Sequence, residues 1–114
     1  MAIPLEITAL IEQLDQELNQ ISQQATEVLN ILRSRLNSFP DNAILIQFFA
    51  SVSSICLFVE HSQSRIQTIV ERLSLTLSNT DSVIQEAGED LSTLLGLTLE
   101  AKIVVNQLKT RLES

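Results

Sequence analysis

The chain of 114 residues has no tryptophan or tyrosine, one cysteine, one histidine and two glycines. A single cysteine, Cys56, excludes an internal disulfide and suits a reducing compartment, so we expect a cytoplasmic protein. So few histidines, cysteines and glycines leave little material for an active site, a metal centre or a glycine-rich phosphate loop. We therefore expect a protein without catalysis, cofactor or metal.

Basic residues are also scarce, since seven Lys and Arg stand against fourteen Asp and Glu, for a formal charge of −7. Nucleic-acid binding needs a basic surface, and anionic lipids attract one, so this balance argues against both partners. The N-terminus has no basic region ahead of an apolar stretch, and we expect no secretory signal. Hydrophobic residues nevertheless make up 45% of the chain, which excludes a disordered protein.

The dominant pattern is an apolar register with alternating steps of four and three residues, which is the period of helices that bury a seam against each other. Its first run is Ile7, Ile11, Leu14, Leu18, Ile21, Ala25, Val28 and Leu32. The second is Leu45, Phe49, Val52, Cys56, Val59, Ile66, Val70, Leu73 and Leu77, interrupted by Gln63. The third is Ile84, Ala87, Leu91, Leu94, Thr98, Ala101, Val105, Leu108 and Leu112. We expect a single all-α domain over 1–114, with three long helices at about 4–38, 42–78 and 81–112 in an antiparallel coiled-coil-like bundle.

The two helix boundaries differ in strength. Residues 39–42 contain Pro40 and two candidate N-caps, Asp41 and Asn42, which predict a turn. Residues 78–82 are polar but contain neither Gly nor Pro, and the register passes through them unchanged. Two alternatives stay open: a helical hairpin whose very long second helix, from about 42 to 112, would span on the order of 100 Å, and a four-helix version broken near residues 60–63.

The predicted core combines large apolar residues of all three helices: Leu14, Leu18, Ile21, Val70, Leu73, Leu91 and Leu94. Two polar residues, Arg35 and Gln63, occupy seam positions. Such residues can fix register and partner number at a cost in stability, and we prefer this interpretation to a ligand site.

Residues 43–59 are apolar around the whole helix and contain no charge. The run is shorter than the roughly 20 residues of a membrane span and includes four polar residues, so we expect no membrane span. A helix in a three-helix bundle keeps one side in solvent, so the surplus apolar residues need a partner. We predict an oligomer interface at Ile44, Phe48, Ile55, Phe58, Leu95, Leu99 and Ile103.

These features predict a self-associating helical bundle, a dimer or trimer, that acts as a non-catalytic scaffold or adaptor through protein–protein contacts. An alternative is a signalling relay that uses His61, because a histidine exposed on a helical bundle is similar to that of histidine phosphotransfer domains. Those domains place Lys and Gly three and four residues after the histidine, where this chain has Ser64 and Arg65.

A second alternative is a metal-dependent nucleotide phosphohydrolase on Glu86, Glu89 and Asp90, whose spacing places carboxylates within reach of one Mg²⁺. The pairs Glu12 with Asp15 and Glu86 with Glu89 resemble the acidic motifs of all-helical nucleotide pyrophosphohydrolases, although in the opposite order along the chain.

Overall fold

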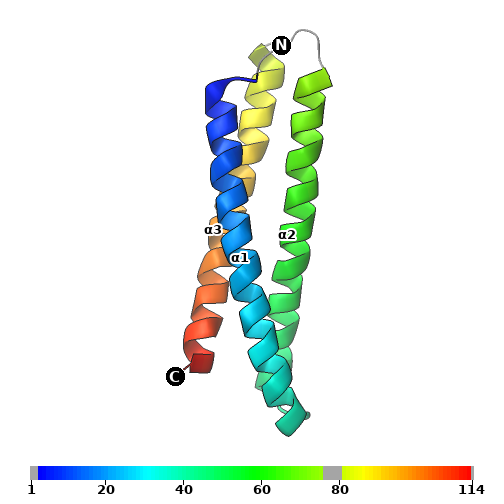
Figure 1. Ribbon diagram of the computed structural model, residues 1–114, viewed down its shortest axis with the longest axis vertical. Coiled ribbons are helices and arrows are strands. Elements are labelled where there is room, and N and C mark those ends of the chain that lie inside the picture. The colour runs from blue at the N-terminus through cyan, green and yellow to red at the C-terminus, as the bar shows by residue number, and fades with distance from the viewer. Residues whose placement is uncertain (1–2, 76–80, 114) are drawn as a thin grey trace.

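The computed structural model describes residues 3–75 and 81–113, nearly all of them in three long α-helices. Helix α1 covers Leu5–Ser38, α2 covers Ala43–Leu75 and α3 covers Asp81–Glu113. In Figure 1, α1 runs down, α2 runs up and α3 runs down along one long axis, and the whole bundle measures 58 × 21 × 17 Å. The predicted all-α three-helix bundle is confirmed. A second helix on the order of 100 Å long is excluded, because α3 folds back along α1 and α2.

Local interactions explain where the first two helices begin. The carbonyl of Pro4 accepts hydrogen bonds from the backbone N–H groups of Ile7 and Thr8, and α1 follows from Leu5. Asn42 caps α2, because its side-chain Oδ1 accepts a hydrogen bond from the N–H of Leu45 at 3.1 Å. The predicted turn at 39–42 therefore exists. The predicted end of the second helix at 78 lies outside the described residues.

The core follows the predicted register closely in α1 and α3. All predicted apolar seam positions of these two helices are buried except Ile11, Ile84 and Ala101, which are half-buried. The polar seam residue Arg35 is exposed. Among the described residues, the polar side chains of Ser62 and Thr98 are also buried. Thr98 donates a hydrogen bond from its hydroxyl to the carbonyl of Leu94 at 2.7 Å. This local bond satisfies the hydroxyl inside an apolar core.

In α2, the predicted seam positions Phe49, Cys56, Gln63 and Val70 were wrong, because none of them is fully buried. The predicted seam position Leu77 lies outside the described residues. The buried residues are Leu45, Val52, Ile55, Val59, Ser62, Ile66, Ile69 and Leu73. Three of these eight lie one residue before a predicted position: Ile55 replaces Cys56, Ser62 replaces Gln63, and Ile69 replaces Val70. Cys56 and Val70 are half-buried, and Gln63 is exposed. Because α2 is apolar on several sides from 43 to 59, two registers fit this segment equally well. One takes steps of four and then three from Leu45, as predicted, and the other takes steps of three and then four.

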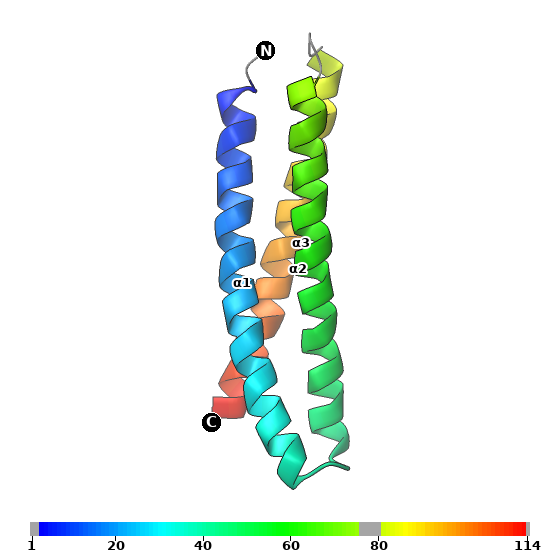
Figure 2. The same ribbon diagram turned by 45° about the vertical axis from the view of Figure 1, so that its right-hand side comes forward.

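Helices α2 and α3 are the least closely packed pair, since each makes most of its contacts with α1. In both Figure 1 and Figure 2, α3 diverges from α2 toward its C-terminal end, while α1 crosses between them. The side formed by α2 and α3 is therefore tight at one end of the bundle and open at the end of the 39–42 turn.

Candidate functional site

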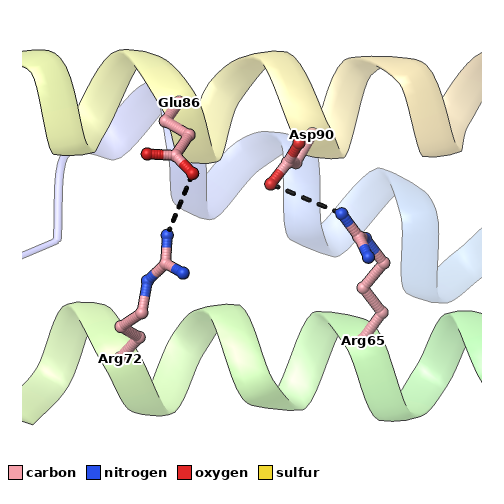
Figure 3. Close-up of polar contacts among 4 residues, drawn as sticks. All are labelled: Arg65, Arg72, Glu86 and Asp90. Carbon is pink, nitrogen blue, oxygen red and sulfur yellow. Dashed lines mark hydrogen bonds and ion pairs between the residues drawn. The ribbon is translucent and has the colours of Figure 1, made fainter.

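Two ion pairs join α2 to α3 at the tight end. Arg65 Nη2 lies 3.5 Å from Asp90 Oδ2, and Arg72 Nη2 lies 3.5 Å from Glu86 Oε1 (Figure 3). These side chains are largely exposed, so each pair contributes at most about 1 kcal/mol to stability. They are nevertheless informative about the fold, because they show which sides of α2 and α3 face each other.

The same sides change character toward the open end. Residues seven apart share one side of a helix, and stepping back from Arg65 in sevens gives Phe58, Ser51 and Ile44. Stepping forward from Asp90 gives Leu97, which is 47% exposed, and Val104, which is 40% exposed. The charged pairs are thus replaced by apolar or neutral residues until the last step on α3, which reaches Arg111 near its C-terminal end. Phe48 lies one turn after Ile44, and both line a hollow at the open end. We call the following residues the open α2–α3 face: Ile44, Phe48, Ser51, Phe58, Leu97 and Val104.

The predicted interface residues of α2 are divided between this face and the core. Ile44 is 61% exposed, and Phe48 and Phe58 are half-buried on the open α2–α3 face. Ile55 is only 9% exposed and belongs to the core cluster of the chain itself. The expectation that Ile55 points outward was wrong, because it occupies a true seam position of α2.

The predicted interface residues of α3 lie on other sides of that helix. Lys102 Nζ pairs with Glu17 Oε2 of α1 at 2.9 Å, so Leu95, seven residues earlier, also faces α1 and is half-buried. Leu99 and Ile103 are exposed on the side of α3 that follows Lys102 around the helix and points away from α2. The residues that face α2 are instead Leu97 and Val104, which the sequence analysis missed. The sequence did contain one signal for them. Leu97 and Val104 lie seven and fourteen residues after Asp90, an acidic residue that can pair with Arg65 of α2.

A hollow of about 490 Å³ lies at the open end, between the last turn of α1, the first turn of α2 and the end of α3. Its lining includes the apolar side chains of Phe39, Ile44 and Phe48 and two arginines, Arg35 and Arg111. The guanidinium of Arg35 donates a hydrogen bond to the backbone carbonyl of Leu112. Arg35 therefore ties α1 to the end of α3 instead of occupying a buried seam position.

Charge is distributed unevenly along the bundle. The half formed by 5–22, 60–75 and 81–97, here the acidic half, contains ten acidic and two basic residues. The half formed by 23–59 and 98–113, here the neutral half, contains four acidic and five basic residues. The net charge is therefore −8 on the acidic half and +1 on the neutral half. The open α2–α3 face belongs almost entirely to the neutral half.

The structure gives the histidine alternative little geometric support. His61 is exposed on α2, and Arg65, one turn later, pairs with Asp90. A phosphoryl group on His61 would have to compete with that carboxylate for the guanidinium.

Cys56 is half-buried nearby on α2, and its burial raises the pKa of its thiol. The negative charge of Glu60 raises this pKa further, and the positive charge of Arg33 opposes the increase. Raising this pKa reduces the thiolate population at neutral pH, so the thiol is a poor nucleophile.

The acidic alternative is also weakened, because its three carboxylates do not converge. Glu86 and Asp90 face α2 and its arginines, whereas Glu89 accepts a hydrogen bond from Gln85 of its own helix at 3.1 Å. Within residues 3–75 and 81–113, no group of three or more His, Cys, Asp or Glu side chains is placed to hold a metal ion.

By length and composition alone, α2 could cross a membrane. Its most apolar 18-residue window has a mean hydropathy of 1.9, and only 17% of that window is buried inside the bundle. Core helices of soluble proteins can show the same hydropathy, but they are mostly buried, so the exposed surface of α2 needs a physical explanation.

Fold and surface together define an antiparallel three-helix bundle with one uncharged, partly apolar face. The chain matches no protein-family model, no curated protein and no solved structure.

Proposed function

We propose that this protein is a coiled-coil-like helical bundle that associates with itself through the uncharged part of α2 and the adjoining side of α3. In this proposal it acts as a non-catalytic scaffold or adaptor in the cytoplasm. The observation that carries the proposal is the combination of absent charge and poor burial along α2 between 43 and 59. Three exposed apolar side chains, Ile44, Ile46 and Leu57, lie there, and four more lie on α3 between 97 and 104.

The physical basis is the free energy of apolar burial, about 25 cal/mol for each Å² removed from water. Charged surface costs free energy to desolvate, so apolar interface centres are depleted in charge. The stretch 43–59 meets this requirement and lies on a continuous rigid helix. Association then gives the protein a role in bringing chains together, with no need for a catalytic group.

A matched pair of variants tests this proposal. Ile44 lies in the first turn of α2 and is 61% exposed, whereas Leu5 lies in the first turn of α1, at the opposite end, and is 86% exposed. An aspartate is compatible with the first turn of either helix, where the helix dipole favours negative charge. Both Ile44→Asp and Leu5→Asp should therefore fold.

In sedimentation equilibrium at micromolar concentration, we expect the wild-type chain and Leu5→Asp to form dimers or trimers. Ile44→Asp should weaken association by at least about tenfold, because it places an unpaired charge in a desolvated contact. A monomeric wild type would refute the proposal. Equal association of the two variants would show that the uncharged part of α2 is not involved.

A further inference from the structure

We propose that the occupant of the open α2–α3 face is the same face of a second copy, in an antiparallel two-fold dimer. This inference rests on the proposed function and names the partner, its orientation and the residues nearest the symmetry axis. In such a dimer, α2 packs against the partner's α2 and α3 against the partner's α3. The two faces together form a four-helix core, with each α1 on the outside.

The first support for this arrangement is the width and chemistry of the face. It is made of sides of two helices that diverge toward this end, so another pair of helices covers it more completely than a single segment. Ser51 is a small neutral residue between Ile44 and Phe58, and Val104 follows Leu97 on α3. A second copy supplies a surface with the same composition, in which the six residues of the face carry no charge and Arg111 lies at its end beside the hollow.

The second support is the charge distribution along the bundle. If two copies paired in parallel, their acidic halves, each with a net charge of −8, would lie side by side. In the antiparallel arrangement, the neutral halves overlap and the acidic halves point in opposite directions. The ion pair between Arg65 and Asp90 then lies beyond the overlap, so both charges stay near water. Charge thus selects orientation, as it does at other interfaces.

The available area agrees with a modest affinity. From the exposures of its apolar side chains, the face offers on the order of 300 Å² of apolar surface per copy, and a dimer would bury on the order of 600 Å². Specific interfaces at the lower end of the size range bury about 1,200 Å² in total, of which a little over half is apolar. A dimer of micromolar affinity is therefore expected.

Symmetry makes the arrangement testable with single cysteines. Position 51 is midway between Ile44 and Phe58, so the two-fold axis brings Ser51 close to Ser51 of the partner subunit. The ion pairs of the acidic half fix the level of α3 relative to α2, and at this register Val104 lies at the same level along the bundle as Ser51. In a Cys56→Ser background, Ser51→Cys and Val104→Cys should each form a disulfide-linked dimer on mild oxidation.

Ser64→Cys in the same background is the matched control, because Ser64 is exposed on α2 outside the overlap. We expect each of the other two variants to crosslink at least about tenfold faster than this control at micromolar concentration. Circular dichroism establishes that each variant is folded, and two independent positions keep the test decisive if one substitution perturbs α2.

The outcomes separate this inference from the proposed function. A dimer in which Ser64→Cys crosslinks as fast as the other two variants would overturn the antiparallel arrangement and leave self-association intact. A monomeric wild type would overturn both. A monomer that floats with vesicles of zwitterionic phosphatidylcholine, and is released by Ile44→Asp, would show that the face binds lipid and would overturn a second copy as the occupant.

Discussion

At the scale of single residues, Gly96 lies inside α3 without a structural need for glycine. A Cβ atom built at this position meets nothing within 4 Å, and no described residue has a positive φ. Glycine costs a helix about 1 kcal/mol relative to alanine, so Gly96→Ala should raise the free energy of unfolding by about that amount. Urea denaturation at fixed protein concentration measures the change.

Gly88 provides a comparison for Gly96. A Cβ atom at this position would lie 3.5 Å from Cδ1 of Ile7, which is ordinary van der Waals contact. Gly88→Ala should therefore also be stabilising, by a similar amount. A loss of stability in Gly96→Ala would show that the outer surface of α3 is constrained by something beyond the isolated chain.

At the scale of elements, the alternate seam positions of α2 can be tested directly. Ile69 is buried and Val70 is half-buried, although the heptad pattern alone favours the reverse. Ile69→Ala should lower the free energy of unfolding by roughly 2 to 4 kcal/mol, because it leaves a cavity in the core. Val70→Ala should cost less than about 1 kcal/mol, since solvent already reaches the side chain and alanine has the higher helix propensity. Equal losses in urea denaturation would contradict this register.

The contrast among the helices shows what the sequence could predict. In α1, polar residues flank the seam, and in α3 the apolar seam continues from Ile84 to Leu112, so Leu18 and Leu91 were placed correctly in the core. In α2, apolar residues surround the helix, and the pattern could not distinguish Ile55 from Cys56 as the buried residue. Periodicity reports how many sides of a helix are apolar, but neighbouring helices decide which of those sides is covered.

The candidate face was only partly predictable for the same reason. Its α2 residues stood out as surplus apolar residues, whereas Leu97 and Val104 did not, because α3 has several apolar sides of similar strength. Their selection depends on how α3 is rotated relative to α2. That rotation is visible through contacts between helices, such as those of Arg65 with Asp90 and of Lys102 with Glu17. Helix rotation is a tertiary property that a single-helix pattern does not encode.

At the scale of the whole molecule, the separation of charge along the bundle predicts how association responds to salt. In the antiparallel dimer, the two acidic halves extend away from each other, and each copy is 58 Å long. The Debye length is about 10 Å at 0.1 M salt and about 3 Å at 1 M, so repulsion between distant ends is already screened at the lower concentration. Raising NaCl from about 0.1 to about 1 M should therefore change the dimer dissociation constant by less than about threefold. Sedimentation equilibrium in the two buffers measures this ratio.

In a parallel dimer, the two net charges of −8 would lie side by side, and salt would strengthen association by about tenfold or more. A response of that size would contradict the antiparallel arrangement, while still agreeing with self-association through the uncharged face.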